Sequence, residues 1–269
     1  MYEKERYLLL KGLPKELKEE LYKNKAMIIG GAIRSIFTKE KINDYDIYFK
    51  EIKGLNTMYS YISGASGASS QEVLNKDKKP KPLFGLKKFT KTSNAYSFYN
   101  KKTGLKIQLI RTFSGNDVNY IFGKFDFTVC MGAYDFEKNI FIFGDRFFKD
   151  NTSKTLIINL GTEYPINTML RVKKYLRKGY SISGIEMVKL ALTINNVSII
   201  THEELQHHLM GIDTLILEKF FDEKGKKVGE GEDQNLGNLP YDYSTFIDEL
   251  QAFIEREYSH LRFGDDDIL

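Results

Sequence analysis

The sequence predicts an α+β protein in which a mixed sheet with flanking helices is followed by a helical region. Three observations carry this prediction. Short apolar runs bounded by turn residues recur through the first 160 residues, as is typical of strands. Segments with helical spacing lie between those runs. From Pro165 onward the spacing is helical, with Met169, Val172 and Leu176 on one predicted face.

The first part of the chain alternates between the two kinds of element. Pro14 suits the first turn of a helix, and Gly104 lies in a turn between two strand-like runs, which indicates a hairpin. The expected helices cover residues 14–25, 32–38, 55–62 and 117–122. The expected strands cover residues 26–30, 45–50, 94–99, 105–113, 127–136 and 140–144.

The change of pattern near residues 155–165 predicts two domains. We expect a head domain over residues 1–160 and a helical neck and C-terminal region over 161–269. Within the second, residues 165–178, 185–195 and 243–263 are expected to be helical, and a polar, glycine-rich linker is expected near 224–240. In the head, residues 63–82 are rich in Ser, Gly and Lys, which indicates a mobile loop at the edge of the site.

Composition narrows the class of protein. With 42% hydrophobic and 28% charged residues in a chain of 269, we expect a soluble globular protein. The net charge of +4 permits a polyanionic partner without demanding one. A single cysteine, Cys130, excludes an internal disulfide, fits a reducing compartment and is expected in the core of an apolar strand. The charged N-terminus and the lack of an apolar run of ~18 residues lead us to expect a cytoplasmic protein that avoids membranes.

The segment with most chemical content joins a glycine pair to a pair of carboxylates. Gly30 and Gly31 follow an apolar run, and Asp44 and Asp46 lie at the start of the next strand. Alternate strand residues point the same way, so the two carboxylates share a face and repel each other unless a cation lies between them. Oxygen ligands of this kind suit Mg²⁺ carrying substrate phosphates, and glycines let backbone N–H groups approach a phosphate closely.

This arrangement, with Arg34 between the two pairs, resembles the polymerase β-type nucleotidyltransferase superfamily. Class II tRNA nucleotidyltransferases, bacterial poly(A) polymerases and small phage-type relatives share a Gly-Gly-x-x-Arg turn and helix followed by an Asp-x-Asp strand. The resemblance implies a nucleotidyltransferase-like mixed sheet with a helical neck. It also implies that Asp44 and Asp46 are catalytic and bind Mg²⁺ or Mn²⁺, and that Gly30, Gly31 and Arg34 bind the nucleotide phosphates.

Two further segments resemble the same family. Lys124-Phe125-Asp126-Phe127-Thr128 matches its Arg-Arg-Asp-Phe-Thr segment in the last three residues. The resemblance implies a nucleotide contact for Asp126 and a weaker phosphate contact for Lys124, because lysine lacks the planar fork of arginine. The stretch from Met169 to Tyr175 resembles the neck helix, which implies nucleotide-binding roles for Arg171 and Lys174. The plain alternatives, a turn-holding aspartate and a solvated helix face, stay open.

Two departures from the family pattern limit the assignment. The strand position at which the superfamily commonly has a third carboxylate is Gln108 here, which cannot act as an anionic ligand or base. The family's base-reading Glu-Asp-x-x-Arg segment is missing, so nucleotide preference does not carry over. Arg111, three residues after Gln108, either contacts a phosphate or pairs on the sheet surface.

Together, the residues and the resemblance predict a metal-dependent nucleotidyltransferase. It transfers a nucleoside monophosphate from a nucleoside triphosphate to an acceptor hydroxyl, releasing pyrophosphate. By family analogy the acceptor is an RNA end, with a tRNA 3′ end first, while a protein hydroxyl or a small molecule stays open. The alternative from a different class is a catalytically silent nucleotide- or RNA-binding module. A toxin- or antitoxin-like partner protein is neither supported nor excluded, and the oligomeric state stays unknown.

Overall fold

The computed structural model describes residues 2–63, 83–91 and 94–197, together with residues 208, 248, 249, 252 and 256. The chain divides into two compact units, Met1–Gly161 and Thr162–Leu269. Most of the predicted loop over 63–82, the predicted linker over 224–240 and nearly all of the predicted last helix over 243–263 lie outside the described residues. Every helix in the described part of the chain is too short or too polar to cross a bilayer.

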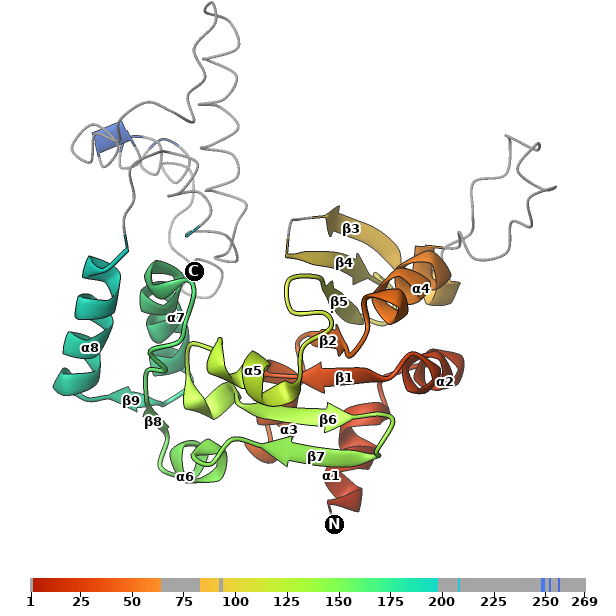
Figure 1. Ribbon diagram of the computed structural model, residues 1–269, viewed down its shortest axis with the longest axis horizontal. Helices are drawn as coiled ribbons and strands as arrows, with labels where there is room; N and C mark the ends of the chain where they lie inside the picture. Colours follow the sequence, from red (N-terminus) through yellow and green to blue (C-terminus); the bar gives the residue numbers. More distant parts are fainter. Residues whose placement is uncertain are drawn as a thin grey trace, which may run out of the picture. The chain divides into compact units, whose positions relative to one another are not determined.

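The first unit is built on a seven-stranded mixed sheet, which confirms the predicted α+β class (Figure 1). The strand order is β3-β4-β5-β2-β1-β6-β7. Every neighbouring pair is antiparallel except β2 and β5, which run parallel. The strands are β1 (Ala26–Ile29), β2 (Tyr45–Phe49), β3 (Lys87–Lys91), β4 (Ala95–Tyr99), β5 (Lys106–Ile110), β6 (Gly132–Asp135) and β7 (Ile140–Phe143).

Helices cover both faces of this sheet, and side-chain alternation along the strands decides what each face buries. On one face Ile28, Ile47 and Leu109 belong to a core shared with α1, α2, α3 and α4. On the other face Met27 and Ile29 pack with residues of α5, which lies across the sheet in Figure 1. These helices are α1 (Glu3–Leu10), α2 (Lys15–Lys23), α3 (Gly31–Phe37), α4 (Ile52–Ser63) and α5 (Val118–Gly123).

The segment after α5 differs from the expectation. Residues 127–136 are not one strand, because Thr128–Cys130 forms a 3₁₀ turn (η3) and only Gly132–Asp135 pairs as β6. Side chains of α6 (Phe147–Thr152) hold the turn: the Thr128 hydroxyl donates to the buried Asp150 carboxylate at 2.5 Å, and the Asn151 amide donates to the Val129 carbonyl at 3.0 Å. Cys130 is therefore buried in a turn instead of a strand.

In the second unit the described elements are α7 (Pro165–Arg177), β9 (Ser181–Ile182) and α8 (Gly184–Asn195). The helices predicted over residues 165–178 and 185–195 are present. The predicted apolar face of α7 is only partly correct, because Val172 is buried whereas Met169 and Leu176 are 42% and 46% exposed. Tyr175, which packs edge-on against Tyr180 with ring centroids 5.4 Å apart, takes the buried position instead.

Candidate functional site

The chain turns sharply at Gly30, between β1 and α3. Gly30 has φ +95°, a left-handed conformation that residues with a side chain rarely adopt. Its N–H donates to the Gly132 carbonyl at 2.9 Å and its carbonyl accepts from the Arg34 N–H at 3.1 Å, so both backbone groups fix the turn. Gly31 begins α3 with a half-exposed backbone, and a Cβ added there would meet nothing within 4 Å. The turn thus leaves backbone open to a ligand at Gly31.

The carboxylate of Asp46 lies beside this turn. β1 and β2 are antiparallel and pair Ile28 with Ile47, which brings the end of β1 next to the start of β2. A Cβ built on Gly30 would lie 4.0 Å from Asp46 Oδ2. Asp44 comes just before β2, two residues from Asp46, and both side chains are half-buried. The structure therefore brings the glycine turn and at least one of the two predicted acids together.

The buried Tyr45 side chain determines which face of the sheet its neighbour Asp46 points to. Its side chain points into the core face, and its hydroxyl donates to the Leu9 carbonyl of α1 at 3.0 Å. Burial raises the pKa of the Tyr45 hydroxyl to about 12, because the charged phenolate would be poorly solvated there. Because neighbouring strand residues point to opposite faces, a buried Tyr45 directs Asp46 to the face covered by α5.

Gln108 lies directly across from Asp46. β2 and β5 are parallel, and their register pairs Asp46 with Gln108. The strand position at which the superfamily commonly has a third carboxylate therefore presents an amide next to Asp46. Within the described residues, no group of three or more His, Cys, Asp or Glu side chains is placed to hold a metal ion. Two carboxylates are still enough for Mg²⁺, which commonly binds one or two carboxylates together with substrate phosphates and water.

The Lys124–Asp126 segment approaches the same turn from α5. The Phe125 ring comes within 3.4 Å of the Cβ position of Gly30, so an aromatic ring packs on the glycine turn where the family segment has an arginine. Lys124 is half-exposed, with its ammonium 5.6 Å from the centre of the Tyr120 ring. Asp126 is 6% exposed and accepts a hydrogen bond from the Phe127 N–H at 2.9 Å, which fits the turn-holding alternative.

Asn159 fixes this segment and could not be singled out from the sequence. Its side-chain amide lies 3.1, 2.9 and 2.7 Å from the carbonyl oxygens of Phe122, Gly123 and Phe125. Its backbone N–H donates to the Asp126 carbonyl at 2.8 Å. One side chain therefore holds the backbone that carries Phe125 and Asp126. No motif marks this asparagine, because its partners lie more than 30 residues away in the chain.

Arg34, on α3, is held in an ion pair. Its side chain is 3% exposed, and Nη1 and Nη2 donate to the two carboxylate oxygens of Glu40 at 2.8 Å each. Lys154 adds a second cation 3.5 Å from Glu40. A guanidinium held in a two-pronged ion pair away from solvent stabilises the fold around α3. The phosphate contact of Arg34 stays a prediction, and it would have to compete with Glu40 for the guanidinium.

Arg111 also lies away from the two acids. Its guanidinium carbon is 4.9 Å from the centre of the Tyr96 ring. Tyr96 pairs with Leu109 on β5 and packs against the core shared with α4, so it belongs to the face opposite Asp46. Of the two alternatives for Arg111, this position favours pairing on the sheet surface, and a phosphate contact stays a prediction.

The remaining basic residues with a predicted nucleotide-binding role lie on α7 of the second unit. Arg171 is half-buried and Lys174 is exposed. Their contact with a nucleotide stays a prediction.

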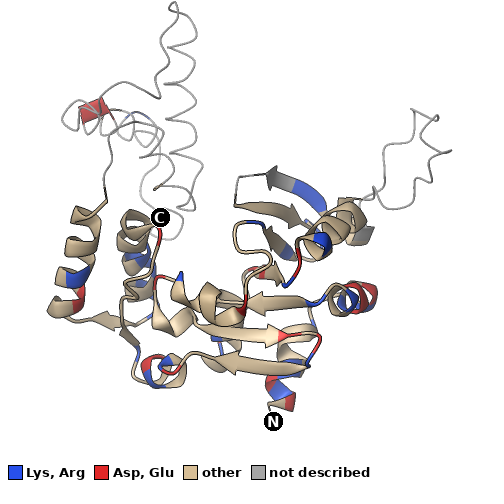
Figure 2. Ribbon diagram, in the orientation of Figure 1, with Lys and Arg blue, Asp and Glu red and all other residues tan. Residues whose placement is uncertain are grey.

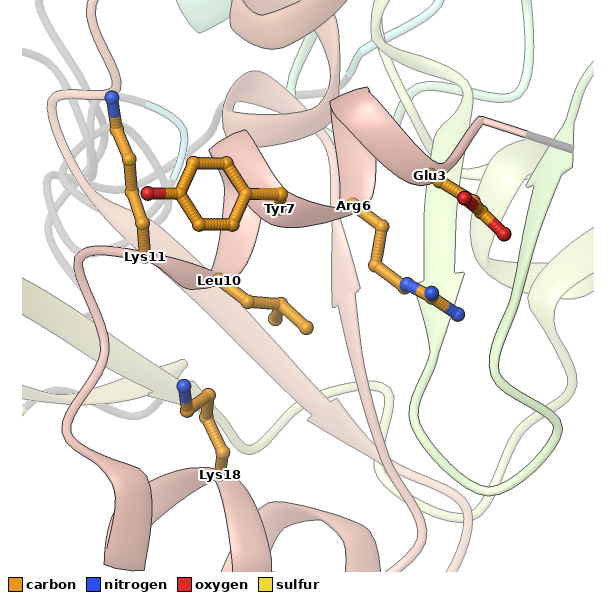
Figure 3. Close-up of a pocket in the computed structure, with 6 residues that line it drawn as sticks. All are labelled: Glu3, Arg6, Tyr7, Leu10, Lys11 and Lys18. Carbon is orange, nitrogen blue, oxygen red and sulfur yellow. The ribbon is translucent and has the colours of Figure 1, made fainter.

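A separate hollow of about 300 Å³ lies between α1 and α2 (Figure 3). Arg6, Lys11 and Lys18 line it together with the carboxylate of Glu3. None of the predicted site residues is among its lining. Basic and acidic residues (Lys, Arg and Glu) are interleaved along these two helices (Figure 2), and the lining of the hollow combines three cations with one carboxylate.

Comparisons with known proteins give one family. A family model described as "Gabija anti-defense 2 family protein" matches residues 3–154. A protein of Bacillus phage SPbetaL7, named "Gabija anti-defense 2", is 34% identical over 269 residues, which is 100% of this chain and 60% of the relative. The chain thus spans about 60% of the length of the curated relative that it matches. The phage source agrees with the resemblance to small phage-type proteins.

The solved structures that the chain resembles include CCA-adding enzymes. A Thermotoga maritima enzyme complexed with tRNA is 14% identical with a TM-score of 0.46, covering 71% of this chain and 45% of that one. A CCA-adding enzyme in complex with CTP is 15% identical with a TM-score of 0.49, covering 95% of this chain and 56% of that one. Both are enzymes of the kind that the motifs resemble.

Proposed function

The chain belongs to the Gabija anti-defense 2 family, and we propose that its first unit is a metal-dependent nucleotidyltransferase that serves an anti-defense role against Gabija. The observation that carries the proposal is the meeting of the Gly30 turn with the Asp46 carboxylate. A glycine turn with open backbone and a half-buried carboxylate at its side supply the two parts needed to bind a triphosphate with its cation.

In this proposal Asp44 and Asp46 hold Mg²⁺ or Mn²⁺, which when bound neutralises phosphate charge and lowers the pKa of the acceptor hydroxyl. The glycine pair binds the phosphate tail: Gly30 shapes the turn, and the open backbone at Gly31 contacts the phosphate. Lys124 adds a positive charge beside it, and Asp126 positions the sugar. Asn159 keeps the Phe122–Asp126 backbone in place. Arg171 and Lys174 of the second unit supply further positive charge. Most of the rate comes from positioning and charge neutralisation.

The acceptor in this proposal is an RNA end, with a tRNA 3′ end as the first candidate by family analogy. Phe125 packs on the glycine turn in place of the family's arginine, which leaves Lys124 as the one cation of that segment. Because lysine supplies a point charge without a two-pronged fork, we expect weak retention of the free triphosphate and a high KM. A protein hydroxyl or a small molecule is the alternative acceptor.

Incubation with each triphosphate labelled at its α-phosphate, Mg²⁺ or Mn²⁺, and total RNA tests the proposal. We expect label to move to RNA with release of pyrophosphate, and both signals to vanish when the metal is chelated. Label on a protein or small molecule would keep the chemistry and change the acceptor. Absence of pyrophosphate release with every triphosphate and both metals would overturn the proposal.

A second candidate is a catalytically silent module that binds nucleotides or RNA. Gln108 opposite Asp46 and the pairing of Arg34 with Glu40 favour it, because each removes a group that a transfer reaction would use. Nucleotide binding without pyrophosphate release in the same experiment is the result that this candidate predicts.

A further inference from the structure

A hollow of about 440 Å³ lies at the end of β5, on the α4 face of the sheet. It is on the face opposite Asp46, because Tyr96 in its lining packs against the core shared with α4. Its size is in the range of small-molecule sites, roughly 300–1,000 Å³. The lining residues are Ile52, Leu55, Asn56, Asn94, Tyr96, Arg111, Thr112 and Ser114.

Two of the lining residues, Arg111 and Tyr96, belong to a row of planar and cationic groups that continues outside the hollow through Tyr59 and Lys88. The Arg111 guanidinium carbon lies 4.9 Å from the centre of the Tyr96 ring. The Tyr96 and Tyr59 rings follow with centroids 4.2 Å apart. At the far end the Lys88 ammonium lies 5.6 Å from the centre of the Tyr59 ring. A guanidinium over an aromatic face is attracted by the ring, and this contact restrains the Arg111 side chain.

The polar part of the lining is fixed by hydrogen bonds. The backbone N–H of Arg111 donates to the backbone carbonyl of Asn94 at 2.8 Å, and the Thr112 hydroxyl donates to Asn94 Oδ1 at 3.0 Å. The Ser114 hydroxyl donates to the Ile110 carbonyl at 2.9 Å. Asn56 enters from the exposed surface of α4. The groups that line the hollow are therefore built into the strand end and loop, which lowers the entropy lost on binding.

The charge of the lining indicates a ligand with a phosphate group. Arg111 is the one charged residue in the lining, so the hollow presents a single cation with no carboxylate beside it, whereas in the hollow of Figure 3 the carboxylate of Glu3 lies among three cations. Guanidinium donors match phosphate oxygens, and the amides and hydroxyls can pair with the edge of a base. Ile52 and Leu55 add apolar contact for a flat ring.

We propose that this hollow is a second binding site, which takes one nucleotide unit with its phosphate against Arg111. The unit comes either from a free nucleotide or from single-stranded RNA. The site needs neither Asp44 nor Asp46, and it does not rest on the proposed transfer reaction.

Binding by the full chain in EDTA tests the proposal, because chelation removes metal-dependent binding at the two acids. The probes are AMP, measured by calorimetry, and a fluorescein-labelled 12-nucleotide RNA, measured by anisotropy. Arg111→Gln is expected to weaken binding of at least one probe about 10- to 100-fold, the range for losing a hydrogen bond between two charged groups. For the RNA, the slope of log affinity against log salt should also fall by about 0.7.

Two matched pairs keep the test decisive. Lys101→Gln removes one charge from the exposed β4–β5 turn, outside the hollow, and is expected to change binding less than twofold. Asn56→Glu places a negative charge in the hollow, whereas Thr57→Glu places it on the neighbouring exposed position outside the lining. Both positions are exposed on α4, so both variants should fold, and only Asn56→Glu should weaken binding by 5-fold or more.

Loss of AMP affinity alone would identify a free nucleotide as the source, and loss of RNA affinity alone would identify an RNA strand. Failure of the wild-type chain to bind either probe in EDTA would overturn the proposal. Equal affinities of Asn56→Glu and Thr57→Glu for both probes would overturn it as well. A larger effect of Lys18→Gln than of Arg111→Gln would place the nucleotide in the hollow of Figure 3 instead and contradict the proposal.

Discussion

The predicted site residues have different surroundings on the two faces of the sheet. On the α5 face, Asp46 and Phe125 lie beside the Gly30 turn, and Gln108 lies across from Asp46 on β5. On the α3–α4 side, the two predicted arginines contact other protein groups: Arg34 is buried against Glu40, and the Arg111 guanidinium lies over the Tyr96 ring. Sequence spacing therefore predicts which residues are candidates for the Asp46 site. The strand face that a side chain occupies and the presence of a counter-charge beside it determine which other groups it contacts.

The largest expected effect concerns the Arg34–Glu40 pair. Glu40→Ala leaves a buried guanidinium without its carboxylate, which should lower the free energy of unfolding by about 3 kcal/mol. For a domain of this size the melting temperature should fall by about 6–12 °C. Glu19→Ala, which removes an exposed partner 4.0 Å from Lys15, is the control and should cost less than about 1 kcal/mol. An unchanged melting temperature for Glu40→Ala would favour the predicted phosphate contact of Arg34 instead.

The next effect tests the α5 face. Asp46→Asn keeps the size of the side chain and removes its charge, so we expect pyrophosphate release to fall at least about 100-fold while the melting temperature stays unchanged. Asp145→Asn, at an exposed position between β7 and α6, should release pyrophosphate at the wild-type rate. Equal rates for the two variants would remove Asp46 from the catalytic group.

The glycine pair offers a comparison within two residues. Gly30→Ala forces a side chain into a conformation with φ +95° and against Phe125, which should cost about 1–2 kcal/mol of stability. Gly31→Ala meets open space and should be neutral or slightly stabilising. Urea unfolding of both variants measures the difference. Similar midpoints for the two would show that the turn does not depend on the conformation of Gly30.

The smallest effect is a pH dependence at Tyr45. Its pKa is 10.0 in an unfolded chain and about 12 in the fold, so the folded state retains the proton more strongly. The stability gained from the buried neutral hydroxyl is present below pH 10 and is lost as the pH rises toward 12. Tyr45→Phe loses the hydrogen bond to Leu9, about 1 kcal/mol, and should lack this part of the decline. Parallel unfolding curves of both proteins from pH 8 to 12 would contradict this account.

Much of the fold follows from local sequence. The apolar runs gave β1 and β2, the glycine at 104 gave the β4–β5 hairpin, and the helical spacing gave α7 and α8. The 3₁₀ turn at Thr128–Cys130 did not follow, because an apolar run reads as a strand until the distant Asp150 and Asn151 supply hydrogen-bond partners.

The parts of the candidate site that depend on nearby sequence were also predictable, whereas the parts that depend on distant residues were not. The neighbourhood of Gly30 and Asp46 follows from a short connection between two strands and from a motif that marks both. The burial of Arg34 depends on Glu40, which no pattern singles out. The position of Arg111 depends on which face Tyr96 occupies, and Asn159 reaches its partners only through the folded chain.

Manganese binding tests the central claim most directly. Electron paramagnetic resonance measures free Mn²⁺ in the presence of the chain and a non-hydrolysable triphosphate. If Asp44 and Asp46 hold the cation beside the glycine turn, the wild-type chain should bind Mn²⁺ with the nucleotide, and the variant with both Asp44→Asn and Asp46→Asn should bind it at least about 10-fold more weakly. Equal Mn²⁺ affinities of the wild-type chain and this double variant would contradict the account.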